Sequence, residues 1–484
     1  MANYIMMMGT SSHVGKSILA TAMCRILYRK GRKVVPFKAQ NMALNSYVTR
    51  DGDEMGRAQV AQAEAAGMEP MVDMNPVLLK PTGNAASQVI IMGKPVGNMS
   101  AREYHRGYSL KAFDAVKEAL GRLDKEYDTI VIEGAGSPAE INLKANDIVN
   151  MRVAKYLQAP VLLIADIDRG GALASLVGTL ELLDEEERAL VKGLVINKFR
   201  GDVTLLTPAI DFLEKKTGKP VLGVVPHIDQ MGIDDEDSVS LEEKQAAPTE
   251  GDIRIAVIQT PKISNFTDFD ALAHEKDVAL YYVKSVEDLG EPDVIMLPGS
   301  KNTTEDMLYL RKSGLGEKIL AHAKAGKAVI GICGGYQMLG EVIRDPQHTE
   351  SQNDEAAGLG LLGMETVFAS EKLTSQVVAQ CQDLHFMGQS ISADNLQGYE
   401  IHMGHTAFTR EADKHPFAVC QRRGKTCASQ EGTANAAGNV FGTYIHGVFD
   451  NDVFRRSVLN ALRHSKGLEA LANTRNVMAE KQKV

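Results

Sequence analysis

Cysteine is scarce in this chain of 484 residues, which contains five, at positions 24, 333, 381, 420 and 427. A small and odd number of cysteines argues against the disulfide frameworks that hold small secreted domains together. Cys420 and Cys427 are separated by six residues and have no histidine at ligand spacing, so they do not form a zinc-binding pattern. We therefore predict no structural metal site.

Long hydrophobic stretches are also missing, since no apolar run approaches the roughly 20 residues of a membrane-spanning helix. The first four residues, Met-Ala-Asn-Tyr, lack the basic region and cleavage site of a secretory signal. The 53 Lys and Arg residues are outnumbered by 62 Asp and Glu residues, and the net charge of −9 disfavours non-specific binding to nucleic acids or anionic membranes. We expect a cytoplasmic protein without a membrane span or a nucleic-acid partner; its oligomeric state is left open.

The length and the hydrophobic pattern predict two α/β domains. A chain of this length, 44% apolar, exceeds what one hydrophobic core usually holds. Short apolar runs alternate with glycine-rich turns and helical patterns, which is typical of βαβ units around a parallel sheet. The predicted strands of the first half are 4–8, 129–132, 160–165 and 193–196, and those of the second half are 253–259, 294–297 and 328–332.

An acidic segment separates the two halves. Residues 234–251 are polar and acidic without an apolar period, and we interpret them as a linker rather than a surface loop because a strand begins directly after them. This gives a first domain over residues 1–233 and a second over residues 252–450. A helix over 453–463 and a tail complete the region 451–484, and the polar stretch 345–357 is predicted to be an insertion loop.

A glycine-rich loop, Gly-Thr-Ser-Ser-His-Val-Gly-Lys-Ser at 9–17, follows the first predicted strand and precedes a helix. In such a loop, Gly15 lets backbone N–H groups close around phosphate oxygens, Lys16 reaches the terminal phosphates and the Ser17 hydroxyl ligates Mg²⁺. Five residues separate Gly9 from Gly15, whereas the common pattern has four. The alternative is a turn that only caps the helix. The strand–loop–helix context favours a nucleotide site that includes Thr10, Ser11, Ser12, His13, Val14, Gly15, Lys16 and Ser17.

Two further residues fit the same site. Glu133 ends a buried strand at the edge where ligands of open α/β sheets bind, so it is a candidate Mg²⁺ ligand; a solvated carboxylate is the alternative. Asn197 follows another strand and is a candidate for reading the nucleotide base, although helix capping explains it nearly as well.

Cys333 lies where a predicted strand turns into a helix, within Gly-Ile-Cys-Gly-Gly. Flanking glycines permit the strained turn that exposes a nucleophile, and the helix N-terminus favours the thiolate. The N–H groups that follow Cys333, beginning with Gly334, can bind a developing oxyanion, and Gly299 is a candidate second donor. The other four cysteines are expected to be inert buried residues.

A cysteine nucleophile needs a base, and two histidines are candidates. His446 lies between Gly442 and Gly447 at the end of a short apolar run, and His402 lies in Gly-Tyr-Glu-Ile-His-Met-Gly. The sequence alone brings neither histidine close to Cys333.

These motifs resemble known families. Residues 331–337, with a downstream His446, resemble the class I glutamine amidotransferases. The first half resembles the dethiobiotin synthetase-like ATPases, whose phosphate loop has the same extra residue. In this order the two domains resemble the corrinoid amidases, and residues 36–46, 74–81, 133–142 and 168–171 resemble the cobyric acid synthase family.

The resemblance implies ATP- and glutamine-dependent amidation of carboxylates b, d, e and g of adenosylcobyrinic acid a,c-diamide, which gives adenosylcobyric acid in cobalamin biosynthesis. ATP would convert each carboxylate to an acyl phosphate. Cys333 would form a glutamyl thioester, and His446 would shuttle the proton that releases ammonia. Ammonia would need a protected path between the domains.

The resemblance leaves two roles open. Many class I amidotransferases have a glutamate two residues after their histidine, but position 448 is valine here, so the residue that orients His446 is unassigned. The family-like segments also contain candidate corrinoid contacts, for which turn and cap chemistry is an equal alternative. These candidates are Gln40, Asn41, Asn45, Glu140, Asn142 and Asp147.

Three other functions remain as alternatives. The nearest is cobyrinic acid a,c-diamide synthase, which has the same architecture. Another is an amidotransferase for a different carboxylate, such as a cell-wall lipid precursor. The third is a P-loop partitioning or switch ATPase with a degenerate amidotransferase domain, against which the intact Cys333 and His446 argue.

Overall fold

The computed structural model describes residues 2–83, 85–228, 251–473 and 476–477. The chain divides into two compact units, one made of Met1–Ala43, Met55–Asp234 and Lys481–Val484 and the other of Leu44–Glu54 and Asp235–Glu480. Residues 44–54 therefore belong to the second unit, although the predicted first domain includes them. The predicted linker lies outside the described residues, except for Gly251.

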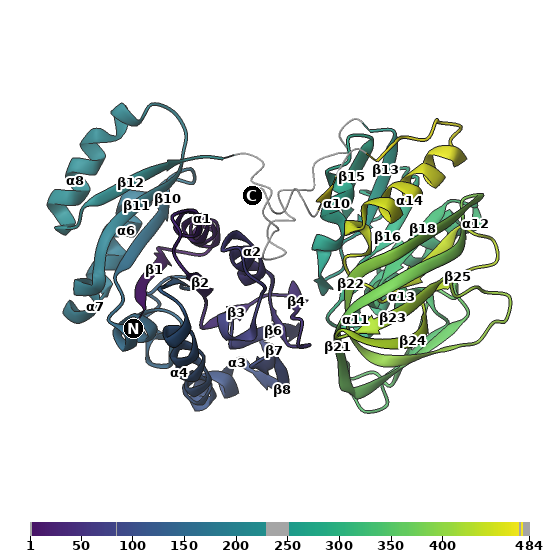
Figure 1. Ribbon diagram of the computed structural model, residues 1–484, viewed down its shortest axis with the longest axis horizontal. Helices are drawn as coiled ribbons and strands as arrows, with labels where there is room; N and C mark the ends of the chain where they lie inside the picture. The colour runs from purple at the N-terminus through teal and green to yellow at the C-terminus, as the bar shows by residue number, and fades with distance from the viewer. Residues whose placement is uncertain (1, 84, 229–250, 474–475, 478–484) are drawn as a thin grey trace. The chain divides into compact units, whose positions relative to one another are not determined.

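The first unit is built on a six-stranded parallel sheet (Figure 1). Its order is β12 (Val221–Pro226), β11 (Val191–Phe199), β10 (Val161–Asp166), β1 (Asn3–Gly9), β9 (Thr129–Glu133) and β2 (Val34–Phe37). Each of the four strands predicted in this half lies within one of these elements or is displaced from it by a single residue. Helices α1 (Lys16–Arg29), α4 (Ser109–Glu126) and α6 (Ala172–Leu182) pack along the sheet.

The parallel pairing brings the phosphate loop and Glu133 to one edge of this sheet. Strand β1 pairs with β9 in a register that sets Met7 opposite Glu133, so the loop that follows β1 begins beside that carboxylate. A second, four-stranded sheet lies alongside, in the order β3 (Gln40–Met42), β6 (Val77–Gly83), β7 (Ala86–Ile91) and β8 (Lys94–Ser100).

The second unit has its own six-stranded sheet, which is parallel except at one edge. Its order is β15 (Val278–Val283), β13 (Ile253–Ile258), β16 (Val294–Leu297), β18 (Ala328–Ile332), β26 (Val440–Thr443) and β25 (Thr433–Ala434). The three strands predicted here are confirmed as β13, β16 and β18, and the predicted helix is confirmed as α14 (Asp452–Ser465).

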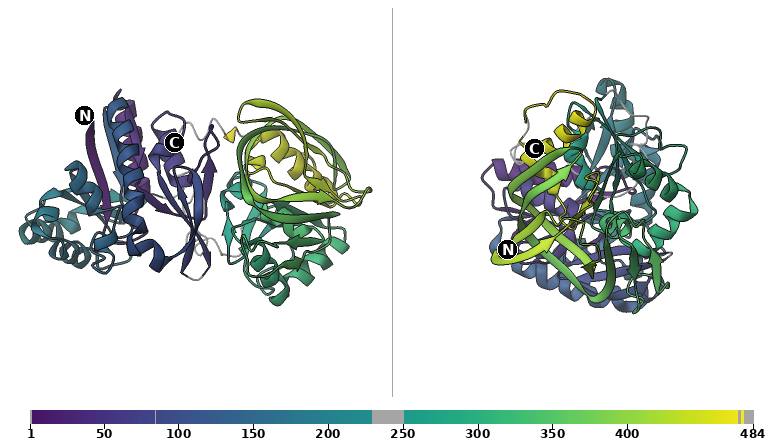
Figure 2. Two further views of the ribbon diagram at one scale, coloured as in Figure 1. Left: turned by 90° about the horizontal axis from the view of Figure 1, so that it is seen from below. Right: turned by 90° about the vertical axis from the view of Figure 1, so that its right-hand side faces the viewer.

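The sequence pattern did not predict a further, mostly antiparallel sheet in this unit. Its centre is a long hairpin of β21 (Met364–Phe386) and β22 (Gln389–Phe408), and β22 packs against α14 (Figure 2). The sheet also contains β19 (Val342–Arg344), β20 (Glu355–Ala357), β23 (Phe417–Arg422) and β24 (Lys425–Glu431). The predicted insertion loop 345–357 thus ends in strand β20.

All five cysteines are free. Within the described part of the chain, no helix is long and apolar enough to cross a membrane.

Candidate active site

Cys333 lies on a strained turn between β18 and α13 (Gly334–Leu339). Its φ of 52° is in the left-handed region, which is unusual for a residue with a side chain and is typical of nucleophile turns. A side chain would not fit at Gly335, because a Cβ there would lie 2.0 Å from the carbonyl oxygen of Leu297. The backbone N–H of Cys333 donates to Thr443 O at 2.9 Å, which fixes the turn against β26. The predicted elbow is present.

His446 is held by a carboxylate that the sequence did not reveal. Its Nδ1 lies 2.7 Å from Oδ2 of Asp268, and the other oxygen of Asp268 accepts the N–H of Gly447 at 2.9 Å. Asp268 lies in the 3₁₀ helix η5 (Phe266–Phe269), and both side chains are buried. The Nε2 of His446 has no hydrogen-bond partner among the described residues, so it is available for a reacting group. Asp268 therefore takes the orienting role that Val448 cannot fill.

The environment of His446 favours the imidazolium. Burial alone would lower the pKa of His446, but the negative charges of Asp268 and Cys333 raise it, to about 10 in total. This influence requires Cys333 to be close to His446. A protonated histidine beside a cysteine is the arrangement that stabilises a thiolate nucleophile.

His402 is a neutral neighbour rather than the base. Burial, followed by the charge of His446, lowers the pKa of His402 to about 3, so the ring is uncharged at neutral pH and is too weak a base to hold a proton taken from the thiol. Its ring stacks on Tyr444 at a centroid distance of 3.8 Å. The preceding residue contacts the nucleophile, since Ile401 O lies 3.6 Å from Sγ of Cys333. The geometry therefore favours His446 over His402.

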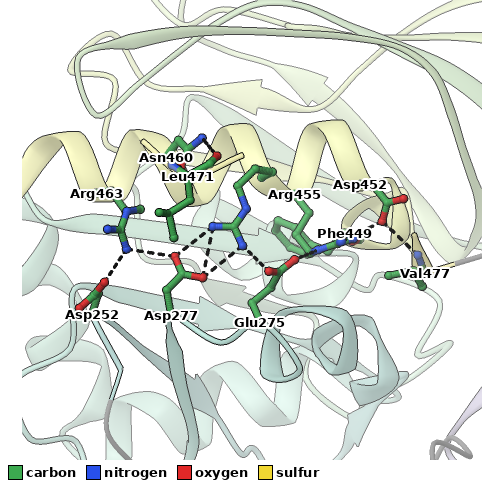
Figure 3. A network of polar contacts seen from close by, with 11 residues as sticks. Asp252, Glu275, Asp277, Phe449, Asp452, Arg455, Asn460, Arg463, Leu471 and Val477 are labelled. Carbon is green, nitrogen blue, oxygen red and sulfur yellow. Dashed lines mark hydrogen bonds and ion pairs between the residues drawn. The ribbon is translucent and has the colours of Figure 1, made fainter. Parts of the chain in front are cut away.

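Charged groups fasten the segments that follow Asp268 and His446 to each other (Figure 3). Arg455 of α14 donates to Glu275 Oε1 at 2.7 Å and to Phe449 O at 2.9 Å. Arg463 reaches Asp277 and Asp252 from the same helix. Glu275 comes shortly after Asp268, and Phe449 shortly after His446. Arg455, with its buried ion pair to Glu275, thus links the segment that carries Asp268 to the segment that carries His446.

The two predicted oxyanion donors also gather here. A Cβ on Gly299 would lie 3.3 Å from Cε1 of His446, and one on Gly334 would lie 2.7 Å from the backbone N of Ser300. The backbones of Gly299 and Gly334 are therefore next to each other and to the histidine, as an oxyanion site requires.

The phosphate loop of the first unit surrounds the ammonium group of Lys16. Gly15 precedes α1 with a φ of 97°, a conformation that favours glycine. The Nζ of Lys16 donates to Ser11 O at 2.9 Å and to Gly136 O at 3.2 Å, so the lysine bends back over its own loop. The carbonyl groups of Ser11 and Gly136 thus hold a buried ammonium group at the loop.

Ser17 and Glu133 are in contact. The Ser17 hydroxyl donates to Glu133 Oε1 at 2.8 Å. Two residues that sequence reasoning missed share the same carboxylate: Lys38 contacts Oε1 at 2.8 Å and Gln62 donates to Oε2 at 2.6 Å. Glu133 is only 1% exposed, so it is not a solvated strand-end carboxylate.

Asn197 supports the loop. Its Nδ2 donates to Val14 O at 2.8 Å, and a Cβ on Gly15 would lie 2.2 Å from that nitrogen. Lys198 donates to His13 O at 2.8 Å and pairs with Asp166. The amide nitrogen of Asn197 is thus bonded to the loop rather than offered to a base.

The candidate corrinoid contacts differ in exposure and in hydrogen bonding. Glu140 and Asn142 are exposed, whereas Asp147 accepts the N–H groups of Val149 and Asn150. Gln40 accepts the hydroxyl of Tyr104, and Asn41 donates to Gln59. Asn45 lies in the second unit, where it accepts the N–H of Phe266.

Comparison with known proteins matches both units. Residues 5–238 match the model of the CobQ/CobB/MinD/ParA nucleotide binding domain, and residues 254–454 match that of the CobB/CobQ-like glutamine amidotransferase domain. The chain is 56% identical over 468 residues to a cobyric acid synthase of Pelotomaculum thermopropionicum, with 97% of this chain and 89% of that protein covered. It is 54% identical to a cobyric acid synthase of Moorella thermoacetica, with 100% and 93% covered.

The fold and the Cys333–His446–Asp268 arrangement define a glutamine amidotransferase joined to a nucleotide-binding domain. The match to cobyric acid synthases extends over nearly the whole chain at more than half identity. The chain belongs to the cobyric acid synthase family.

Proposed function

We propose that this chain is an ATP- and glutamine-dependent amide ligase that amidates side chains b, d, e and g of adenosylcobyrinic acid a,c-diamide. The product is adenosylcobyric acid, an intermediate of cobalamin biosynthesis. The observation that carries this proposal is the Cys333–His446–Asp268 arrangement, found in a chain that matches cobyric acid synthases over almost its full length.

The second unit would supply ammonia from glutamine. The Cys333 thiolate attacks the side-chain amide carbon, and the backbone N–H groups near Gly334 stabilise the oxyanion. Imidazolium His446 gives its Nε2 proton to the departing nitrogen, which leaves as ammonia. The glutamyl group remains bound to Cys333 as a thioester. Neutral His446 then takes a proton from water, whose oxygen attacks the thioester. Glutamate leaves and the Cys333 thiolate and the imidazolium are restored.

Asp268→Asn is expected to lower kcat/KM for glutamine hydrolysis about 10²-fold. The amide holds the His446 ring less well than the carboxylate does, and it does not stabilise the positive charge of the imidazolium. Loss of the carboxylate lowers the pKa of His446 from about 10. The imidazolium then loses its proton at a lower pH, so the alkaline limb of the kcat/KM profile shifts to lower pH. Glutamate release measured across neutral and alkaline pH checks both effects.

Asp270→Asn is the matched control, since it makes the same change two residues further along. It is expected to leave the alkaline limb in place. An unchanged limb in Asp268→Asn would contradict the role assigned to Asp268.

The first unit would activate the corrinoid carboxylate. A carboxylate oxygen attacks the γ-phosphorus of ATP, the bond to ADP breaks, and an acyl phosphate forms. Ammonia then attacks the acyl carbon, and phosphate leaves. This chemistry depends on positioning and on charge stabilisation, which Lys16 and the loop N–H groups would supply; the buried ammonium group of Lys16 beside the loop supports this role.

The residues beside the loop fit a magnesium ion. Ser17 and Glu133 offer a hydroxyl and a carboxylate oxygen in contact with each other, and Mg²⁺ usually takes one or two protein oxygens besides water and phosphate. Lys38 already pairs with that carboxylate, so the buried charge is balanced by a cation at present. When bound, Mg²⁺ would neutralise charge on the phosphates. Ser17 and Glu133 would hold it.

Four of the six candidate residues are proposed to contact the corrinoid. Among the six candidates, Glu140 and Asn142 have exposed side chains, whereas the carboxylate of Asp147 accepts two backbone N–H groups of its own turn. Gln40 and Asn41 occupy β3, directly before the segment that joins the second unit. We assign corrinoid binding to Gln40, Asn41, Glu140 and Asn142, and a structural role to Asn45 and Asp147.

Mass spectrometry of the corrinoid tests the function directly. The protein is incubated with MgATP, glutamine and either adenosylcobyrinic acid a,c-diamide or cobyrinic acid. We expect four successive acid-to-amide conversions of the diamide, ending at the hexaamide. Amidation of cobyrinic acid at two positions, with the diamide unchanged, would instead identify an a,c-diamide synthase. If neither corrinoid changes, the proposed substrate is wrong.

A further inference from the structure

Residues 44–54 are a piece of the first half of the sequence that is built into the second unit. The chain belongs to the first unit up to Ala43 and again from Met55. Between these points, β4 (Ser46–Val48) pairs with β5 (Glu54–Gly56). Glu54 forms a buried ion pair with Lys372 at 2.5 Å, and Thr374 donates to Gly52 O at 2.8 Å. The segment is therefore firmly attached to β21.

Its first residues hold the turn that carries Asp268. Asn45 Oδ1 accepts the N–H of Phe266 at 3.2 Å, and Asn265 Oδ1 accepts the N–H of Ser46 at 3.1 Å. These three polar residues are at most 1% exposed. Asn265 has a φ of 52°, and its carbonyl oxygen accepts the N–H of Asp268 at 3.1 Å. Contacts from the segment thus set the backbone from which Asp268 reaches His446.

The same residues hold Tyr399, which lies against His446. The Tyr399 hydroxyl donates to Ser46 O at 3.3 Å and accepts from Asn265 Nδ2 at 3.2 Å. The ring of Tyr47 packs edge-on against Tyr399 at 5.4 Å. On the other side, the rings of Tyr399 and His446 stack at 5.1 Å with an interplanar angle of 16°. The backbones of Tyr399 and His446 also exchange two hydrogen bonds.

We infer that residues 44–54 are a positioning segment of the glutaminase site, which fixes His446 through Tyr399 and Asp268 through Asn265. This inference rests on the proposed function, because it takes glutamine hydrolysis by Cys333 and His446 as given. Both ends of the segment continue into the nucleotide-binding unit. A change in that unit that moves either end would therefore alter the alignment of His446, to which catalysis is sensitive.

Two variants of the full chain test the segment. Tyr47→Leu removes the edge-on contact from within the segment, and Tyr399→Phe removes the hydroxyl but keeps the ring that stacks on His446. Each is expected to lower kcat for glutamine hydrolysis about tenfold, with KM within about twofold, because the histidine is misaligned rather than the glutamine pocket altered. The alkaline limb of the kcat/KM profile is expected to move to lower pH, since a looser Asp268–His446 contact stabilises the imidazolium less.

Thr374→Val is the matched control, because it removes a buried hydrogen bond to Gly52 at the other end of the same segment. It is expected to change kcat by less than about twofold and to leave the alkaline limb in place. A thermal melt of each variant checks that the protein is folded at the assay temperature.

Three results would overturn the inference. Wild-type kinetics in Tyr47→Leu and Tyr399→Phe would make the segment a packing element only. An equal loss in Thr374→Val would show that the loss does not depend on the contacts with Tyr399 and Asn265, through which the segment is inferred to act. Absence of glutamate release from the wild-type protein would remove the proposed function itself, and the inference with it. A fall in kcat and a moved alkaline limb in the two tyrosine variants alone would support it.

Discussion

Cys333→Ala is expected to abolish glutamine hydrolysis, by at least about 10⁴-fold, because no other group replaces the nucleophile. Amidation of the corrinoid with ammonium salts should persist, since acyl phosphate formation depends on residues of the first unit. The thiol lies on a turn that a smaller side chain can also adopt, so the loss reflects chemistry rather than folding. Glutamate release and corrinoid amidation, each measured with glutamine and with ammonium chloride, check the two halves of the prediction.

Cys381→Ala is the matched control. Cys381 is a fully buried, free cysteine of the same unit, and burial raises the pKa of its thiol to about 12. Its replacement is expected to cost some stability but no glutaminase activity. If Cys333→Ala also lost the ammonium-dependent reaction, the separation of ammonia release from carboxylate activation would be wrong.

The nucleophile and the phosphate loop are predictable because each is encoded within a short stretch of sequence. A buried strand, a turn flanked by glycine and a following helix occupy consecutive residues around Cys333 and again around Lys16. At these two places the residues that form the site are neighbours in the sequence as well as in the structure. Seven of the parallel strands were predictable for the same reason, since their apolar runs are continuous, whereas β2, β12, β15 and β26 were missed.

Asp268 was missed because it comes from a distant part of the chain. It lies 178 residues before His446, and only tertiary packing brings the two together. The family pattern directed attention to position 448, where the valine side chain is buried. The one local signal was a cluster of polar residues, Ser264-Asn265 and Asp268, just after a buried strand. Such a cluster is also common in ordinary turns.

The long hairpin of β21 and β22 was missed because its alternation is interrupted. In β22 the buried residues Ile391 and Ala393 alternate, but Leu396 then breaks the period of two. The pairing also shifts register between Ala379 and Cys381 and again before Leu384. A register shift turns the following side chains to the other face, so no long periodic pattern survives in the sequence.

The placement of residues 44–54 was beyond sequence reasoning for a related cause. Domain boundaries predicted from sequence follow chain order, and the composition of Ser46–Val48 gives no sign that this strand belongs to a different unit from its neighbours. Its contacts with Asn265 and Tyr399 join residues more than 200 positions apart. A charged residue, Glu54, is fully buried there only because Lys372 is opposite.

Lys16→Met is expected to lower corrinoid amidation about 10³-fold with either nitrogen source, because it removes the cation that faces the phosphates. The methionine keeps most of the side-chain volume but loses the bonds to Ser11 O and Gly136 O. Lys198→Met is the matched control, since Lys198 also donates to a loop carbonyl, that of His13. Its charge is already balanced by Asp166 at 2.8 Å, so its loss is expected to cost about tenfold or less. Equal losses in both variants would mean that loop support, not charge at the phosphates, is the role of Lys16.

Addition of ammonium chloride distinguishes Lys16→Met from Cys333→Ala. Ammonia restores amidation when only its release is blocked, but it does not attack a carboxylate that has not been activated. Lys16→Met should therefore remain inactive with ammonium chloride while its Cys333 still hydrolyses glutamine, because Cys333, His446 and Asp268 all belong to the other unit. Rescue of Lys16→Met by ammonia would mean that Lys16 acts on ammonia supply, and the acyl phosphate step could then not be assigned to the phosphate loop. The opposite responses of the two variants follow from the proposal that two chemical steps take place at sites in two different units.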